Sequence, residues 1–336
     1  MNARRAAPLP DGRGAGGEGV PPRAGAPRRR ALSPPSSLER GGRTLAPAPL
    51  PSGRGVVAVL PDGRLHLQDG PIDLIIEAEG EPIAVRAAFA AAAHRFDGLL
   101  DALCAELPAL RARAGTAFLD GPIALRMARS VAPFADETFI TPMAAVAGCV
   151  AEAVLDAMLA SGPLDRAFVN NGGDIALHLA PGRRTRIGLV DRPDRPALYG
   201  TAEIAAEDGV GGVATSGWRG RSHSLGIADA VTVLARTAAQ ADAAATVIAN
   251  AVDLAHHPAV TRVPARDIRP DSDLGAIPVT RAVGPLRADE IEAALAAGAA
   301  TAERVIAQNL AVAAALHCAG RTRIVGPLSG FGSEAR

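Results

Sequence analysis

The stretch from Gly211 to Asn250 reads GGVATSGWRGRSHSLGIADAVTVLARTAAQADAAATVIAN, and it decides the fold. Its last part predicts a helix from about Ala238 to about Val252, because Thr237 followed three residues later by Gln240 forms a capping-box pattern. Ahead of the helix, the β-branched apolar run from Ala230 to Leu234 predicts an interior strand. A buried strand followed by an almost uncharged helix therefore forms the centre of the predicted domain.

The polar side chains of this predicted helix lie along one face. Asp242, Thr246 and Asn250 follow one another at intervals of four residues, among positions that are almost all Ala, Val or Ile. A helix with one narrow polar stripe in an arginine-rich chain is predicted to be buried on most sides. Two interpretations of its carboxylate stay open. Asp242 and Thr246 supply oxygen ligands of the kind Mg2+ prefers, or Asp242 is a structural residue hydrogen-bonded to a neighbouring turn.

The segment before the strand combines glycines with polar residues. The glycines are Gly211, Gly212, Gly217 and Gly226, and the polar residues are Thr215, Ser216, His223, Ser224 and Asp229. Exposed backbone of this kind favours a loop that wraps a phosphate or a planar ring, whereas the plainer interpretation is a set of ordinary tight turns. His223 alone is more typical of a surface or core residue, but its Ser and Asp neighbours favour a site.

A second glycine segment lies upstream. Ala167 to Val169 and Ile175 to Leu179 predict two strands, and the residues Asn170-Asn171-Gly172-Gly173-Asp174 between them predict a sharp turn. Since Asn-Gly is a strong turn signal by itself, this segment alone predicts a hairpin without any further role.

The order of these blocks resembles the flavin transferase (ApbE) superfamily. TPMAAVAG at Thr141 to Gly148 is followed by NNGGDI at Asn170 to Ile175, then by VATSG, HSLGIADAVTVL and ADAAAT. The closer likeness is to a short, cytoplasmic-type branch, and it covers roughly Pro61 to Gly326. Several blocks in the family's order are more specific than any single glycine motif. The resemblance implies an α+β protein of the ApbE-like fold, with a mixed or antiparallel sheet and packed helices, over residues 55–330.

The resemblance also implies a chemistry. Transferases of this superfamily bind FAD and Mg2+, and they attach FMN through a phosphoester to a Thr hydroxyl of a target protein, with release of AMP. The residues carried over, together with those proposed above, are Asp242 and Thr246 for the metal, with a main-chain oxygen near 146–148 as a further contact; Gly148, Asn171, Gly172, Gly173, Asp174, Thr215, Ser216, Gly217 and Ser224 for the nucleotide; and His223 and Asp229 for catalysis.

The chain departs from the pattern of the classical transferases. It contains no lysine, so Ala147-Gly148 stands where they have Lys-Gly, and Arg219 or Arg221 would have to supply the missing cation. Two alternatives follow. One is a flavin- or nucleotide-binding protein without transfer, and the other is a different enzyme of sulfur or cofactor metabolism with Cys149 as nucleophile. A lone Cys in an Ala-Val helix is more typical of inert packing.

Composition predicts a disordered tail and the cellular location of the protein. Residues 1–54 contain ten prolines, nine glycines and ten arginines against three acidic residues, a composition typical of a disordered tail. The arginines are not followed by an apolar signal-peptide region, and no run of eighteen apolar residues exists, which predicts a cytoplasmic protein without membrane contact. The predicted partners are a flavin or adenine nucleotide and an acceptor protein, with no nucleic acid. The oligomeric state stays open.

Periodicity predicts the other elements. They are a hairpin from 64–67 and 73–76, helices within 83–114 broken at Gly98 and Pro108, helices at 123–130 and 143–159, strands at 184–189 and 201–205, an irregular connection at 262–279, a helical region at 290–319 and a last strand at 321–325.

Overall fold

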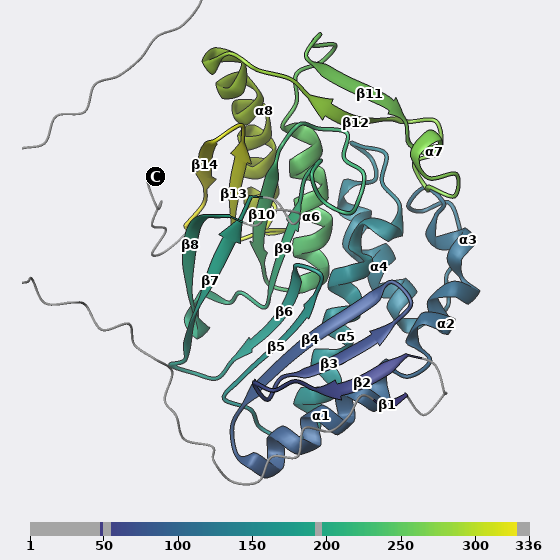
Figure 1. The fold of residues 1–336 in the computed structure, drawn as a ribbon, viewed down its shortest axis with the longest axis vertical. Coiled ribbons are helices and arrows are strands. Elements are labelled where there is room, and N and C mark those ends of the chain that lie inside the picture. The colour runs from purple at the N-terminus through teal and green to yellow at the C-terminus, as the bar shows by residue number, and fades with distance from the viewer. Residues whose placement is uncertain (1–47, 50–54, 192–196, 328–336) are drawn as a thin grey trace, which may run out of the picture. The chain divides into compact units, whose positions relative to one another are not determined.

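The computed structural model describes residues 48–49, 55–191 and 197–327, and a ten-stranded sheet dominates them (Figure 1). The strands of this sheet are Ala48–Pro49 (β1), Val56–Val59 (β2), Leu65–Asp69 (β3), Ile72–Glu79 (β4), Arg166–Asn171 (β5), Asp174–Leu179 (β6), Gly212–Ser216 (β9), Ala230–Ala235 (β10), Ala313–Cys318 (β13) and Arg321–Val325 (β14). They lie side by side in this sequence order, and each neighbouring pair is antiparallel. The prediction of an α+β protein with a mixed or antiparallel sheet is confirmed.

Two smaller hairpins accompany the sheet, and the helices complete the fold. The hairpins are Arg184–Val190 (β7) with Leu198–Ala205 (β8), and Val260–Pro264 (β11) with Pro278–Val283 (β12). The α-helices are Pro82–Phe96 (α1), Leu99–Ala105 (α2), Leu107–Leu110 (α3), Pro122–Val131 (α4), Val146–Ala160 (α5), Ala238–Ala251 (α6), Ala265–Ile268 (α7) and Ala288–Ala307 (α8). Short 3-10 turns occupy Ala132–Phe134, Pro142–Ala145 and Ala206–Asp208.

Strand β10 lies near the middle of this architecture, as its sequence predicts. Every residue of β10 is buried, and its two faces enter two different cores. Val231 and Val233 pack into the large core with helices α5 and α6, whereas Leu234 packs into a small core with Ile204 of β8. Because side chains alternate along a strand, the helices and the β7–β8 hairpin therefore cover opposite faces of the sheet here.

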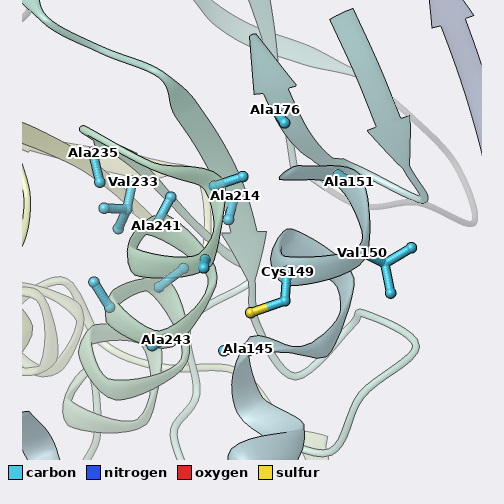
Figure 2. Packing of buried hydrophobic residues seen from close by; sticks show 14 of the residues in the cluster. Ala145, Cys149, Val150, Ala151, Ala176, Ala214, Val233, Ala235, Ala241 and Ala243 are labelled. Carbon is cyan, nitrogen blue, oxygen red and sulfur yellow. The ribbon is translucent and has the colours of Figure 1, made fainter. Parts of the chain in front are cut away.

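Helices α5 and α6 pack against each other and against the central strands of the sheet (Figure 1). Their contact is lined by small residues, and Figure 2 shows Cys149 of α5 directed toward the helix that carries Ala241 and Ala243. Small side chains allow two helices to approach closely, which accounts for the alanine content of both segments. The predicted helix after Thr237 is confirmed as α6, and the predicted buried strand as β10.

Three predicted segments differ from the structure. Gly212–Ser216 is strand β9 rather than part of a loop, 262–279 contains most of the β11–β12 hairpin and α7, and Ala313–Cys318 is strand β13 rather than helix. The alanine-rich sequence of β13 favours a helix by propensity, but its position between β10 and β14 supplies hydrogen bonds on both sides. Pairing with distant strands therefore outweighs local preference. The break at Gly98 is confirmed, and the second break falls at Glu106 rather than Pro108.

The predicted tail lies mostly outside the described residues. A compact unit spans Thr44–Arg336, and within the predicted tail Ala48–Pro49 pairs with β2. Among the described helical stretches, one, Pro142–Ala160, has the length and apolar composition of a membrane span, with a mean hydropathy of 1.8. Half of that stretch is buried inside the protein, as in a core helix, so it is weak evidence for a membrane segment.

Candidate functional site

The site is built where the N-terminal ends of α5 and α6 meet. Gly148, in the first turn of α5, lies against the main chain of Ala238, the first residue of α6. A Cβ atom at position 148 would overlap the Ala238 carbonyl group. Gly148, which the resemblance assigns to the nucleotide, therefore allows the close approach of the main chain of α6.

Each of the two helices supplies a carboxylate to the other's first turn. Asp242 of α6 accepts a hydrogen bond from the Gly148 amide at 2.9 Å, and Glu152 of α5 accepts one from the Ala239 amide at 3.1 Å. These bonds satisfy amides that have no partner inside their own helix, and negative charge is favoured at a helix N-terminus. Asp242 is therefore hydrogen-bonded to a neighbouring turn, as the structural interpretation predicts, and the Ala147 amide adds to this contact.

The capping pattern at the start of α6 is half realised. Thr237 accepts a hydrogen bond from the Gln240 amide at 3.2 Å, as predicted. The reciprocal bond is not made, because the Gln240 Oε1 atom is buried without a hydrogen-bond partner among the described residues. Glu152 caps a different amide of the first turn, that of Ala239.

A second carboxylate faces the same region. Asp174, at the start of β6, accepts a hydrogen bond from the Thr215 amide at 3.2 Å. Burial raises the pKa of Asp174 to about 7, although the Thr215 amide and Arg221 act in the opposite direction. Burial and the charge of Asp174 together hold the pKa of Asp242 well above its usual range. Two carboxylates that repel each other in a half-buried setting favour either a shared proton or a bound cation.

The predicted NNGGD turn is a hairpin turn and also a part of this site. Gly172 and Gly173 have φ angles of 66° and 116°, which favour glycine, and they join β5 to β6. The turn is held by a hydrogen bond from the Gly173 amide to Asn170 Oδ1 at 2.8 Å. Asn171, only 5% exposed, donates to the Ala147 carbonyl at 3.2 Å, so the turn is tied to the first turn of α5.

The structure distinguishes the two arginines predicted to replace the missing lysine. The Arg221 guanidinium lies against Gly172 and acts electrostatically on Asp174. Arg219 instead forms an ion pair with Asp229 at 2.5 Å and stacks over the Trp218 ring at 4.2 Å. Arg221 is therefore the arginine that lies beside the acidic pair.

Asp229, a predicted catalytic residue, is fully engaged elsewhere. One of its oxygens accepts from Arg219, and the other accepts from the Ala319 amide at 2.6 Å. Its own amide donates to the His317 carbonyl at 2.9 Å. These contacts fix the start of β10 to the β13–β14 turn, so the structure does not place Asp229 with Asp242 and Asp174.

Of Thr215, Ser216 and Gly217, Thr215 reaches the site through its main-chain amide. The Thr215 hydroxyl lies 2.9 Å from that of Thr232, which is on the face of the sheet covered by the β7–β8 hairpin. Only the Thr215 amide is directed to Asp174. A Cβ atom at Gly217 would overlap the main chain of Asp229, so this glycine serves close packing.

The far end of the polar stripe anchors the loop that carries His223 and Ser224. Asn250 Oδ1 accepts hydrogen bonds from Ser224 Oγ at 3.1 Å and from the Leu225 amide at 2.9 Å. Between the two ends, the Thr246 hydroxyl makes no hydrogen bond to any residue that the structure describes. At about 1.5 Å of rise per residue, Asp242 and Asn250 lie about 12 Å apart along the helix. The polar stripe on α6 is thus hydrogen-bonded to neighbouring segments at both of its ends, and the Thr246 hydroxyl lies between them.

His223 lies beside residues that the sequence did not single out as a site. Burial, the positive charge of Arg269 and, more weakly, that of Arg281 lower the pKa of His223, against the effect of Asp273. Asp273 accepts a hydrogen bond from buried Thr141 at 2.5 Å. Asp273 lies in the segment 262–279 that was predicted to be an irregular connection, and nothing in its local sequence indicates a contact with Thr141, 132 residues away.

The buried thiol of Cys149 is poorly suited to nucleophilic chemistry. Its side chain is 0% exposed, and burial raises its pKa well above the usual value. The negative charges of Asp242 and Glu152 act in the same direction. Because the reactive species is the thiolate, this environment favours the packing role expected of a lone cysteine.

The family of the chain follows from a family-model match. The model described as "AbpE bacteria" matches residues 57–324, and the chain therefore belongs to this family. The resemblance to the ApbE superfamily is confirmed. The UPF0280 protein MK0206 of Methanopyrus kandleri is 39% identical over 181 residues, which are 53% of this chain and 69% of that protein. A UPF0280 protein of Methanothrix thermoacetophila is 38% identical over 140 residues, which are 39% of this chain and 52% of that protein.

Solved structures show more distant likeness. The Pseudomonas stutzeri flavinyl transferase ApbE in its apo form has a TM-score of 0.33 and 14% identity, covering 78% of this chain and 89% of that one. The flavin transferase ApbE from Vibrio cholerae has a TM-score of 0.25 and 20% identity, covering 49% and 62% of the two chains. The family assignment rests on the family model and not on these values.

Proposed function

We propose that this protein binds a flavin or adenine nucleotide with Mg2+ and transfers FMN from FAD to a Thr hydroxyl of an acceptor protein in the cytoplasm. The observation that supports this most is the pair Asp174 and Asp242 beside the first turn of α5, in which burial raises the pKa of both carboxyl groups and the charge of Asp174 raises the pKa of Asp242 further. Membership of the family matched by the model supports the flavin part of the proposal.

The residues present fit Mg2+. Mg2+ prefers oxygen ligands, and it commonly uses one or two carboxylates while water and substrate phosphates complete its shell. Here the oxygen ligands would be the Asp242 carboxylate, the Thr246 hydroxyl and the Ala147 carbonyl, with Asp174 nearby. The described residues contain no group of three or more His, Cys, Asp or Glu side chains, which disfavours metals that need such a set. When bound, Mg2+ would neutralise charge on the phosphates.

The proposed transfer has a simple balance. The oxygen of the acceptor Thr hydroxyl forms a bond to the phosphorus of the FMN half of FAD, the bond from that phosphorus to the bridging oxygen breaks, and AMP leaves. His223 is the candidate that takes the hydroxyl proton, because its lowered pKa keeps the imidazole neutral near pH 7. Arg221 would hold the nucleotide by its phosphate, in place of the lysine of the classical transferases.

One observation favours a second candidate, a nucleotide-binding protein without transfer. Asp229 is the other residue proposed as a base, and both of its oxygens already accept hydrogen bonds. A transferase of this chain would therefore depend on His223 alone for proton transfer. Binding without AMP release would identify this second candidate.

The test compares nucleotide binding by the full chain and by Asp242→Asn. An amide oxygen at position 242 keeps the acceptor for Gly148 but removes the negative charge. We expect FAD to raise the unfolding temperature of the wild-type protein in the presence of Mg2+, and we expect that rise to disappear in the variant. AMP release from FAD, measured with acceptor-protein mixtures, then separates transfer from binding.

Glu303→Gln is the control, because Glu303 is exposed and its replacement removes one negative charge away from the site. It should behave like the wild-type protein. Equal Mg2+-dependent FAD binding by Asp242→Asn and the wild-type protein would refute the metal assignment. The absence of any response to FAD, FMN or ADP would refute the proposed function as a whole.

A further inference from the structure

A group of positive charges lies at the Asn250 end of the polar stripe, on elements that the family blocks do not include. Ser224, held by Asn250, also accepts a hydrogen bond through its carbonyl from the Thr280 amide of β12 at 2.8 Å. This bond packs β12 against the loop that carries His223, and Arg281, which follows Thr280 in β12, acts electrostatically on the His223 imidazole. Arg269, at the C-terminal end of α7, acts electrostatically on the same imidazole.

The acidic residues near this group already have other partners. On the same segment Arg262 pairs with Asp253, and Asp271 pairs with Arg111 at 2.7 Å. Neither Arg269 nor Arg281 forms an ion pair within the ranges that the structure describes, and both are exposed. The sole acidic group acting on His223 is Asp273, whose Oδ2 is hydrogen-bonded to Thr141.

The His223 ring adds an independent sign of a missing partner. Its Nε2 atom is buried and has no hydrogen-bond partner in the described part of the chain. A buried polar atom without a partner is rare in folded proteins and calls for a ligand or a water molecule. An anion would satisfy the ring nitrogen and both guanidinium groups at once.

We propose that Arg269 and Arg281 bind a phosphate group of the nucleotide beside His223. Guanidinium groups bind phosphate with two parallel N–H donors, which gives them both strength and orientation. The assignment rests on the proposed function for the identity of the nucleotide, but it names residues outside the blocks that carry the family resemblance. The β11–β12 hairpin is then part of the binding site and not only a surface connection.

The test uses the full chain carrying Arg269→Ala and Arg281→Ala together. Calorimetric titrations with FMN, riboflavin and inorganic pyrophosphate separate the phosphate contribution, because riboflavin is FMN without its phosphate. We expect the double variant to bind pyrophosphate at least tenfold more weakly and to lose most of the preference of the wild-type protein for FMN over riboflavin. Riboflavin affinity itself should stay within a factor of two.

Arg266→Ala is the matched control, because Arg266 is an exposed arginine on the same helix α7, and its removal changes the net charge without touching the group. It should bind all three ligands as the wild-type protein does. Thermal unfolding checks that each variant is folded, and single Arg→Gln variants, which keep most of the side-chain bulk, repeat the measurement.

The outcomes separate this inference from the proposed function. Undiminished binding of pyrophosphate and FMN by the double variant would overturn the inference and leave the proposed function standing. Pyrophosphate binding that depends on the two arginines, without binding of any flavin, would support the anion site and refute the flavin assignment. A wild-type protein that binds neither pyrophosphate nor flavin would overturn both.

Discussion

The two ends of the polar stripe on α6 have opposite electrostatic character. The Asp242 end faces Asp174 and two helix first turns, and Arg221 supplies one positive charge beside the two carboxylates. The Asn250 end faces His223, Arg269 and Arg281, and most of the acidic groups around it are already paired.

This difference indicates that helix α6 can position two groups of opposite charge in one binding site. A cation at one end and an anionic group at the other would lie about 12 Å apart along the helix, with the Thr246 hydroxyl between them. A nucleotide with its metal ion combines these two charges in one ligand. Neither end alone points to a nucleotide, whereas the opposite charges along one buried helix do.

The largest expected effect comes from Gly148→Ala, which disrupts the contact between α5 and α6 at the Asp242 end. The added Cβ would overlap the Ala238 carbonyl, and neither backbone can move without separating α5 from α6. We expect a loss of about 3 kcal/mol in the free energy of unfolding, together with loss of Mg2+-dependent nucleotide binding. Urea unfolding measures the first and thermal shift measures the second.

Gly298→Ala in α8 is the comparison for this variant. Its Cβ would meet the side chains of Val252 and Leu316 rather than a main-chain group. Side chains can repack, and a combined Gly298→Ala, Val252→Ala protein should recover part of the stability lost in the single variant. An equal loss in Gly148→Ala and Gly298→Ala would show that the Ala238 contact has no special role.

The next effect concerns the opposite end. Asn250→Ala removes the acceptor for both Ser224 Oγ and the Leu225 amide, and it leaves buried donors without a partner. We expect a loss of about 1 to 3 kcal/mol in the free energy of unfolding. Pyrophosphate affinity should fall as well, since Asn250 anchors the loop that carries His223. Chemical unfolding and titration of the same sample report both changes.

Asn250→Asp tests whether the acceptor is what matters. A carboxylate keeps an oxygen for both donors, and the nearby positive charges favour it. This variant should retain most of the stability but bind pyrophosphate weakly, because the new negative charge competes for the arginines. If Asn250→Asp is as unstable as Asn250→Ala, the hydrogen bonds to Ser224 and Leu225 are not the cause.

The Asp242 end was the more predictable of the two from sequence. Asp242 and Thr246 stand out because polar residues are rare in an apolar helix, and Asn171 to Asp174 stand out through their turn chemistry. Their convergence follows from the sheet, in which β6 pairs with β9 and β9 with β10, directly before α6. Local patterns were therefore sufficient to single out residues that the structure brings together, and the roles that the family resemblance implies for them stay predictions.

The Asn250 end was not predictable in the same way. Arg269, Arg281 and Asp273 lie in a segment without clear periodicity, and this segment forms a hairpin only because β11 pairs with β12 and Thr280 bonds to Ser224. The role of Asp229 was also hidden, since its partner Ala319 belongs to a turn 90 residues away. Contacts between distant segments of this kind leave no mark in the local sequence.

The smallest expected effect is a pH dependence of stability from the Asp242 end. The pKa of Asp174 is 3.8 in a model compound and about 7 in the folded protein, chiefly through burial. Because the pKa of Asp174 is higher in the folded protein than in the unfolded chain, this group stabilises the fold fully at pH values below the pKa of the unfolded chain. The contribution is lost as the pH rises through about 7. The metal-free protein should lose about 1 to 2 kcal/mol between pH 5 and 8 from this group, because solvent screens a half-buried carboxylate.

Comparison with Asp174→Asn isolates this contribution. His223 and His317 have lowered pKa values, so their contribution to stability rises with pH and opposes that of Asp174 in the total. The difference in unfolding free energy between wild type and variant removes the histidine terms. Mg2+ should stabilise the wild-type protein more at pH 8 than at pH 5, because a proton and the metal compete for the same carboxylates. A difference that does not change between pH 5 and 8 would mean that Asp174 is ionised throughout, and the acidic pair would then not need a cation to be stable.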